Sequence, residues 1–339
     1  MQINYFVDEI RLADPLHTSY GIVTGAKNAF VEIRHDNFCG YGEAVPINRY
    51  GENIDNVMSC LKEFSGSLGN DPWAIAATAR LFDSMDFKSS AARSAVNMAM
   101  FDLAGKMLGI PLYKLLGLSS LNTPLISYTI GVDTPENVVK KVLAVPNVPI
   151  IKLKIGTKND LEAIKAIREV SDVTIRVDAN AGWTPKQAIE MINELSAYNI
   201  QFVEQPVAAN DLVGMKLVRE NVSIPIIADE SCLSSEDVPR LSECIDGVNI
   251  KLAKCGGISE ALKIIHTAKA NGLKVMIGCF LESSLAVTAA AHLTPLVDYA
   301  DLDPILFVEH DPYKGISIEN GRITLPEGPG LGVQHRNKE

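Results

Sequence analysis

The chain has 339 residues, more than a single hydrophobic core usually supports, and it is long enough for a barrel of about 250 residues with a second module. Hydrophobic residues make up 47% and charged residues 21%, and no stretch reaches the roughly 18 uninterrupted apolar residues of a membrane span. The net charge of −10, without a long basic run, argues against partners such as nucleic acid or an anionic membrane.

Residues 1–120 are predicted to form an α+β module of their own. The first residues contain neither a basic segment nor a long apolar one, which indicates an untargeted, cytoplasmic protein. Three strands are expected first, in residues 3–12, 29–35 and 40–45. The segment 15–27 is long enough to be a mobile flap. Helical periodicity follows over residues 54–108 and stops at Gly109 to Pro111.

Strands and helices alternate from residue 121, a pattern typical of βα units around a parallel sheet. The strands are expected at 126–132, 151–156, 174–180, 202–206, 224–231, 247–252, 274–279 and 299–302. The helices are expected at 136–143, 161–170, 186–198, 212–220, 235–244, 259–271 and 283–293. Seven βα units and a final strand predict an α/β barrel over residues 121–305. The tail, 306–339, is expected to complete the N-terminal module, with a hairpin around Asn320-Gly321.

Five of the predicted strands end in charge, at intervals of 22 to 26 residues. The charged residues are Lys154, Asp178, Glu204, Asp229 and Lys251. Strands of a parallel sheet are buried on both faces, so a charge on one is costly unless it is paired. Because the C-terminal ends of barrel strands meet at one mouth, where active sites form, we expect these five side chains to face one cavity.

Asp178, Glu204 and Asp229 are candidate metal ligands. Three carboxylates at one mouth would repel one another unless a cation lay among them. All the ligand atoms are oxygen and no histidine is near in sequence, so Mg2+ is expected ahead of Mn2+, and zinc is disfavoured. Asn180 and Glu230 could support these ligands. The alternative is that the carboxylates act separately, as helix caps or surface ion pairs.

Lys152, Lys154 and Lys251 are candidate acid/base groups. Lys152 and Lys154 share one face of a strand, whereas Lys251 comes from the far side of the metal site. A lysine base needs a pKa lowered from ~10.4 toward ~7–8, which burial beside other cations could provide. One lysine would remove the proton α to a metal-bound carboxylate, while Lys152 helps to stabilise the enediolate. Alternatively, the lysines bind a phosphate or carboxylate without proton transfer.

Together these motifs resemble the enolase superfamily, in its muconate-lactonising-enzyme subgroup. The resemblance spans nearly the whole chain and rests on K-x-K at 152–154, V-D-A-N at 177–180, E-Q-P at 204–206, A-D-E-S at 228–231 and N-I-K-L at 249–252. It implies a (β/α)7β modified TIM barrel with an N-terminal α+β capping domain. It also implies Mg2+ on Asp178, Glu204 and Asp229, and acid/base lysines at 154 and 251.

The last predicted strand distinguishes among the reactions of that subgroup. Asp301-Leu302-Asp303 resembles the motif with which dipeptide epimerases bind the substrate's α-ammonium group, and two carboxylates on one strand face suit a cation. Glu282, within 278–284, is expected to bind substrate too. The resemblance implies an isomerase that inverts the Cα of a dipeptide's C-terminal residue, such as L-Ala-D/L-Glu in peptidoglycan peptide metabolism. Alternatively, Asp303 before Pro304 is an ordinary turn residue.

Other functions stay open, namely N-succinylamino acid racemisation, o-succinylbenzoate synthesis and non-enzymatic peptide binding. The flap and the loop 47–51 are expected to meet the side chain of the epimerised residue. Ala-Glu epimerases carry an arginine in this flap, and the segment 15–27 contains none. Lys27 or Arg49 could replace it. The expected partner is a small dipeptide, and assembly into a homo-oligomer is left open.

Overall fold

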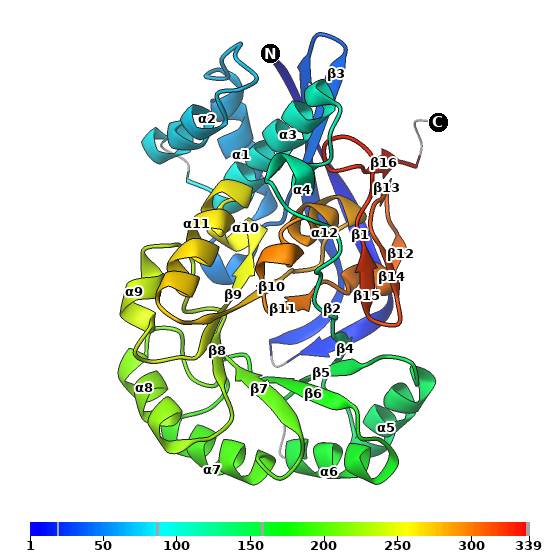
Figure 1. Cartoon of the computed structure of the whole chain (residues 1–339), viewed down its shortest axis with the longest axis vertical. Helices are drawn as coiled ribbons and strands as arrows, with labels where there is room; N and C mark the ends of the chain where they lie inside the picture. Colours follow the sequence, from blue (N-terminus) through cyan, green and yellow to red (C-terminus); the bar gives the residue numbers. More distant parts are fainter. Residues whose placement is uncertain (19, 86–87, 157–158, 337–339) are drawn as a thin grey trace.

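The computed structural model describes residues 1–18, 20–85, 88–156 and 159–336 (Figure 1). An antiparallel sheet with its helices lies at one end, and a parallel barrel ringed by helices lies at the other. No helix in the described ranges is both long and apolar enough to cross a membrane.

The N-terminal sheet has the strand order β12-β1-β2-β3. Its members are β1 (Gln2–Thr18), β2 (Gly21–His35), β3 (Phe38–Ala44) and β12 (Val308–His310). The prediction of a loop at 15–27 is wrong: residues 16–18 pair with residues 21–23, and β1 and β2 form one long hairpin. The β-branched residues at 18 and 22–24 favour this extended form. Ser19, in the predicted flap, lies outside the described residues.

Helices follow β3 in the chain, and the longest of them packs against this sheet. They are η1 (Asn48–Tyr50), α1 (Ile54–Ser65), α2 (Ile75–Leu81), η2 (Phe82–Ser84), α3 (Ser90–Leu108) and α4 (Leu112–Leu115). Ser89 caps α3 by accepting a hydrogen bond from the Ala92 N–H, and Gly109 ends it in the left-handed conformation, which confirms the predicted stop. The central helix α3 packs against β3 and also against helices of the barrel, so it joins the two parts of the molecule.

The described residues contain a barrel of eight parallel strands in chain order. They are β4 (Tyr128–Ile130), β5 (Ile150–Lys154), β6 (Thr174–Asp178), β7 (Ile200–Glu204), β8 (Ile226–Ala228), β9 (Gly247–Lys251), β10 (Lys274–Gly278) and β11 (Tyr299–Asp301). A bridge between Ile126 and Ala300 brings the two edge strands together. In a ring of eight, β5 lies opposite β9 and β7 lies opposite β11, which places the charged strand ends around the mouth.

Helices follow the strands on the outside of the barrel. They are α5 (Pro135–Ala144), α6 (Asp160–Val170), α7 (Pro185–Leu195), α8 (Leu212–Asn221), α9 (Asp237–Leu241), α10 (Leu252–Cys255), α11 (Ile258–Ala270), α12 (Ser284–Ala291) and η3 (Thr294–Leu296). The last strand, β11, is followed by the short η4 (Pro304–Leu306), so the arrangement is (β/α)7β as predicted. The buried β-branched and aliphatic residues of the strands and inner helix faces form the core.

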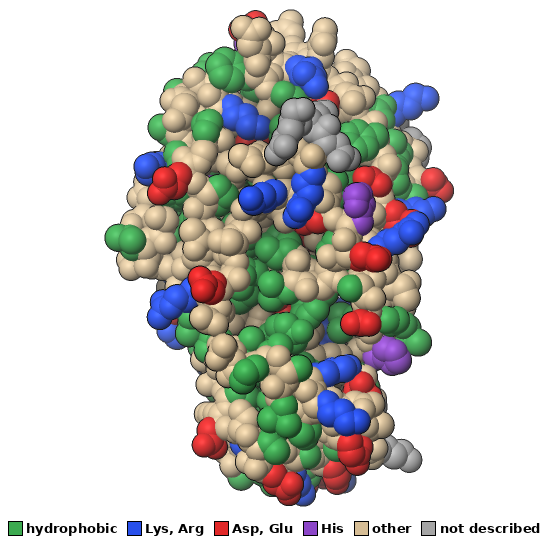
Figure 2. All heavy atoms as spheres, turned by 90° about the vertical axis from the view of Figure 1, so that its right-hand side faces the viewer, with side chains coloured by type: hydrophobic (Ala, Val, Ile, Leu, Met, Phe, Trp, Pro, Cys, Tyr) green, Lys and Arg blue, Asp and Glu red, His purple; other side chains and the backbone are tan. Residues whose placement is uncertain are grey.

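The C-terminal tail returns to the N-terminal part. It contains β13 (Tyr313–Lys314), β14 (Ser317–Glu319), β15 (Arg322–Thr324) and β16 (Gln334–His335). Asn320 and Gly321, both with positive φ, join β14 to β15 and confirm the predicted hairpin. On the face that carries β12 and α5, hydrophobic side chains gather across the middle (Figure 2). The domain boundaries at residues 120 and 305 stay a prediction.

Candidate active site

Three buried carboxylates lie where neighbouring barrel strands end. Asp178 ends β6, Glu204 ends β7 and Asp229 directly follows β8. Side chains from β9 and α10 hold two of them: Asn249 Nδ2 donates to Glu204 Oε1 at 2.7 Å, and Lys254 Nζ donates to Asp229 Oδ1 at 2.7 Å. The structure therefore brings the three predicted metal ligands to one side of the mouth.

Lysine ammonium groups contact these carboxylates. Each carboxylate has an oxygen within 3.1 Å of a lysine Nζ atom, in the pairs Asp178–Lys152, Asp178–Lys154, Glu204–Lys152 and Asp229–Lys251. No group of three or more His, Cys, Asp or Glu side chains in the described part of the chain is arranged to hold a metal ion. The candidate ligands are thus arranged as ion pairs rather than as a coordination shell.

The donor set nevertheless fits a hard divalent cation, because all its donors are carboxylate oxygens. Glu204 Oε2 is buried and accepts no hydrogen bond, although it lies 2.7 Å from Lys152 Nζ. Burial raises the pKa of Glu204 to about 7, and the charge of Asp178 adds to the shift. The raised pKa indicates that the Lys152 ammonium group does not fully offset burial and the charge of Asp178, and a divalent ion would supply further positive charge.

Lys152 and Lys251 show the opposite pKa shift from the predicted one. Burial lowers the pKa of Lys251, but the charges of Asp229 and Glu204 outweigh this effect and leave the pKa above its usual value. Carboxylates raise the pKa of Lys152 in the same way. The prediction of a lowered pKa is wrong for these protein groups, because it considered neighbouring cations and left out the carboxylates that the lysines contact.

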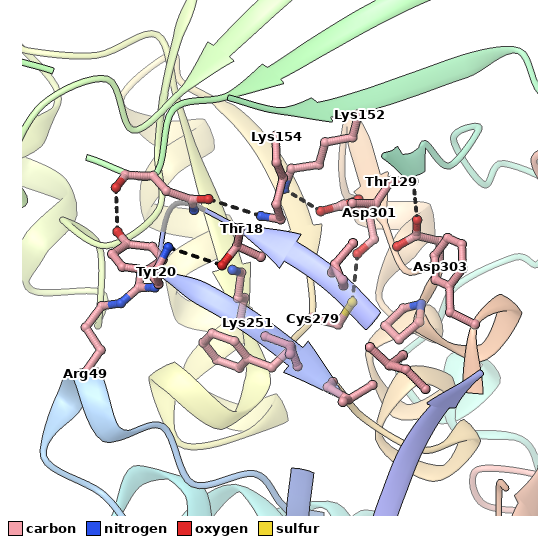
Figure 3. Close-up of a pocket in the computed structure, with 18 of the residues that line it drawn as sticks. Thr18, Tyr20, Arg49, Thr129, Lys152, Lys154, Lys251, Cys279, Asp301 and Asp303 are labelled. Carbon is pink, nitrogen blue, oxygen red and sulfur yellow. Dashed lines mark hydrogen bonds and ion pairs between the residues drawn. The ribbon is translucent and has the colours of Figure 1, made fainter. Parts of the chain in front are cut away.

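Lys154 and Lys251 line one cavity from opposite sides (Figure 3). Their strands, β5 and β9, are four places apart in the ring of eight, so the two side chains approach each other across the mouth. Lys251 Nζ also lies 4.5 Å from the centroid of the Phe280 ring, a distance at which the ring's π face attracts a cation. The cavity has a volume of about 240 Å3.

Asp301 and Asp303 line the same cavity on the β11 side, across from Glu204 on β7. Asp301 accepts hydrogen bonds from Ser127 Oγ at 2.9 Å and from Lys152 Nζ at 2.7 Å, one on each oxygen. Asp303 Oδ2 accepts one from the Thr129 N–H at 2.6 Å. Burial raises the pKa of Asp303 to about 7, and the charge of Asp301 adds to the shift. Of the two, Asp303 is the carboxylate with less positive charge beside it.

The structure does not bring Glu282 into this cavity. Its side chain is buried behind the cavity-lining residues Phe280 and Leu281, and Oε1 accepts a hydrogen bond from the Phe280 N–H at 3.1 Å. Burial raises its pKa to about 8, and the charge of Glu43 contributes. The predicted substrate contact is therefore not formed in this structure: the Glu282 side chain is buried, and Phe280 and Leu281, which precede it, line the cavity instead.

The tip of the β1–β2 hairpin closes one side of the mouth. Tyr20 Oη donates to the Asn180 main-chain oxygen at 2.5 Å and lies 3.3 Å from Glu230 Oε1. Arg49 stacks on the Tyr20 ring, with Cζ 3.4 Å from the centroid, and forms an ion pair with Glu230. Arg49 lines the cavity, whereas Lys27, the other predicted substitute for the flap arginine, does not. We call Tyr20, Arg49, Asn180 and Glu230 the latch.

Sequence reasoning missed three contributors to this site, namely Tyr20, Thr129 and Lys254. Lys254 donates to Asp229 Oδ1 and to the Asn249 main-chain oxygen, and its place three residues after Lys251 could have drawn attention to it. Thr129 acts on Asp303 through its main-chain N–H, which leaves no signal in the side-chain pattern. Tyr20 gave no signal because its partners lie far away in sequence.

The fold and the site define the class of protein. Residues 1–117 match the mandelate racemase / muconate lactonizing enzyme N-terminal domain, and residues 137–339 match the enolase C-terminal domain-like family. The chain belongs to this family of the enolase superfamily, which confirms the resemblance inferred from the motifs.

The individual relatives and solved structures to which the chain is similar include dipeptide epimerases. The chain is 39% identical over 335 residues to an L-Ala-D/L-Glu epimerase from Bacteroides thetaiotaomicron, covering 98% of this chain and 88% of the relative. It is 36% identical to a dipeptide epimerase from Cytophaga hutchinsonii solved with Mg and D-Ala-L-Val, with a TM-score of 0.95 over 100% and 96% of the two chains. It is also 36% identical to a dipeptide epimerase from Enterococcus faecalis solved with Mg and L-Leu-L-Tyr, with a TM-score of 0.94 over 98% and 99%.

Proposed function

We propose that this protein is a Mg2+-dependent dipeptide epimerase, an isomerase that inverts the Cα of the C-terminal residue by means of two lysines. One observation carries the proposal: two sets of carboxylates and two lysines lie on four sides of one mouth. Carboxylates lie on β6 to β8, the D-x-D motif lies opposite on β11, and Lys154 and Lys251 face each other between them.

A zwitterionic dipeptide fits this arrangement end to end. Its carboxylate would lie at the β6 to β8 side beside the Lys152 ammonium group, and its α-ammonium group would lie near Asp301 and Asp303. The carbon next to the carboxylate then falls between Lys154 and Lys251. Muconate and succinylbenzoate carry no ammonium group, so the D-x-D side favours a dipeptide over those substrates.

The two lysines exchange one proton each with this carbon. A neutral lysine amine on one face takes the Cα proton, the C–H electron pair moves into the carboxylate, and an enediolate forms. A divalent ion that balanced the charges of Asp229 and Glu204 would lower the raised pKa of Lys251 and so favour its neutral form. The ammonium group of the other lysine then gives a proton to the opposite face, which inverts the configuration. Lys152 stays protonated and stabilises negative charge on the carboxylate end.

Asp178, Glu204 and Asp229 are the proposed ligands of Mg2+. Bound there, the ion supplies a Lewis acid that stabilises negative charge on the substrate carboxylate. Lys254 and Asn249 keep two of the ligands in place through hydrogen bonds.

The side chain of the epimerised residue is expected near the latch. Glutamate, as in L-Ala-D/L-Glu from peptidoglycan, would use Arg49, the cavity's arginine among the described residues. Arg49 is already paired with Glu230, so an acidic side chain would have to share it.

The test is a dipeptide library assayed by mass gain in D2O, with free and N-acylated members side by side. A free α-ammonium group should be favoured by about tenfold or more through its charge-assisted contacts, and Asp303→Asn should narrow that ratio. Preference for the N-acylated members would replace the proposal with N-succinylamino acid racemisation. No deuterium incorporation in any member would leave a peptide-binding protein.

A further inference from the structure

A second cavity lies directly beside the one that holds the lysines. It has a volume of about 280 Å3 and lies between the β1–β2 hairpin, β4, α5 and η4. Four residues line both cavities, and they are Leu12, Leu16, Thr129 and Phe307. The two cavities are therefore neighbours that share one wall, and we call the second the side cavity.

The expected position of the substrate's ammonium group places the N-terminal residue at this wall. The carbon atom that carries the α-ammonium group also carries the side chain of that residue, so the side chain starts within two bonds of the nitrogen. Asp303, the proposed partner of the ammonium group, accepts a hydrogen bond from Thr129, which belongs to the shared wall. Thr129, Asp301 and Asp303 lie together on one side of the cavity, away from Tyr20 and Arg49 (Figure 3).

The chemistry of the side cavity suits an apolar group. Its lining includes Tyr128, Ile130 and Leu306, and the Phe307 ring packs edge-on against Tyr128 at 4.9 Å. Charged side chains also reach the lining, and Lys141 is already paired with Asp133 at 2.9 Å. The other charged residue of the lining, Asp14, is exposed to solvent, so an apolar side chain that leaves water here would contact mainly the apolar residues.

The volumes of the two cavities also favour a substrate with a large N-terminal side chain. Small-molecule sites usually have about 300–1,000 Å3, and the lysine cavity alone, at about 240 Å3, falls below this range. With the side cavity added, the space falls within the range. The lysine cavity can hold the reacting residue, and the side cavity gives room for a large neighbour.

We propose that the side cavity receives the side chain of the substrate's N-terminal residue, and that this protein prefers dipeptides that begin with leucine or phenylalanine over those that begin with alanine. The inference rests on the proposed epimerase function and deepens it, since it names the substrate class.

The experiment measures deuterium incorporation at the C-terminal Cα for two series of L,L-dipeptides. The N-terminal residue is glycine, alanine, leucine, phenylalanine or lysine, and the C-terminal residue is glutamate in one series and leucine in the other. The kcat/KM of the leucine and phenylalanine members should exceed that of the alanine members by about tenfold, the range that one or two methylene groups provide. Equal or higher values for the alanine members would overturn the inference. Absence of incorporation in every member would instead overturn the epimerase function itself.

Two substitutions of Leu16 should change this preference in opposite directions. Leu16 lies in the wall that the two cavities share, so Leu16→Phe should fill part of this space and lower the leucine-to-alanine ratio of kcat/KM by about tenfold, whereas Leu16→Ala should enlarge the space and raise the phenylalanine-to-alanine ratio. Leu217→Ala, on the partly exposed outer face of α8, is the matched control and should leave both ratios unchanged. A uniform effect of the Leu16 substitutions on all members would contradict the proposal, and the wild-type series decides it even where a variant does not fold.

Discussion

A substitution of Glu204 is the most direct single-residue test of the proposed metal site. Glu204→Gln keeps the shape of the side chain and the bond from Asn249 but removes one negative charge. Its Mg2+ affinity should fall by at least about tenfold, since even groups that only orient a metal ligand contribute 10–100-fold. Isothermal titration calorimetry with Mg2+ measures this directly. Glu190→Gln, on the exposed face of α7, is the control, and activity that persists in EDTA would refute the assignment.

Lys154 and Lys251 should each serve one epimer, because β5 and β9 lie on opposite sides of the barrel. Lys251→Ala should abolish epimerisation but leave exchange of the Cα proton with D2O for one epimer, through Lys154. Lys154→Ala should leave exchange of the other epimer. Proton NMR of each pure epimer in D2O separates the two cases. If both epimers still exchange in either variant, a single base reaches both faces.

The latch joins the β1–β2 hairpin to the loops that follow β6 and β8. Tyr20→Phe removes the hydroxyl that donates to the Asn180 main-chain oxygen, a loss of about 1 kcal/mol. Amide hydrogen exchange at residues 16–18 and 21–23 should become about fivefold faster, and KM should rise. Tyr5→Phe, in the same hairpin but far from its tip, is the control. Unchanged exchange at the tip would mean that the stacking of Arg49 alone holds it.

The parts of the site that the sequence predicts and the parts that it misses differ in physical origin. Lys154, Asp178 and Glu204 are fixed by periodicity, since each ends a buried strand and strands of one sheet end at one edge. The latch depends instead on a contact between residues 160 positions apart, which no local pattern encodes. The length of segment 15–27 predicts a flap, whereas the pairing of residues 16–18 with residues 21–23 keeps the segment extended.

The stability of the whole fold depends on His292, because this residue lies where α12, α4 and the C-terminal tail meet. Its Nδ1 accepts from the Tyr113 N–H, its Nε2 lies 3.1 Å from the Leu331 main-chain oxygen, and its ring stacks on Tyr113. Burial lowers the pKa of His292 to about 4. Below the unfolded value of ~6.5 the unfolded chain binds a proton that the folded chain does not, so acid destabilises the fold by up to about 3 kcal/mol as the pH falls from 6.5 to 4.

His292→Gln should remove this contribution, since glutamine offers one donor and one acceptor and does not titrate. Urea unfolding at pH 7.5 and pH 5 gives the free energy of unfolding of both proteins. The variant should lose less stability between the two pH values than the wild type does. An identical loss would show that other groups account for the acid sensitivity.

The pairing of β12 with β1 has a consequence for how the protein is made. β1 is synthesised well before residues 308–310, its partner at the sheet edge, because the whole barrel lies between them in the sequence. Until then Arg11 and Leu12, at the edge of β1, have main-chain groups that can pair with another chain. Leu331, which donates to the buried carboxylate of Asp102 in α3, arrives later still. The N-terminal sheet can therefore be completed only after the barrel has been translated, and a chain that stalls before residue 308 would leave that part of the edge open to aggregation.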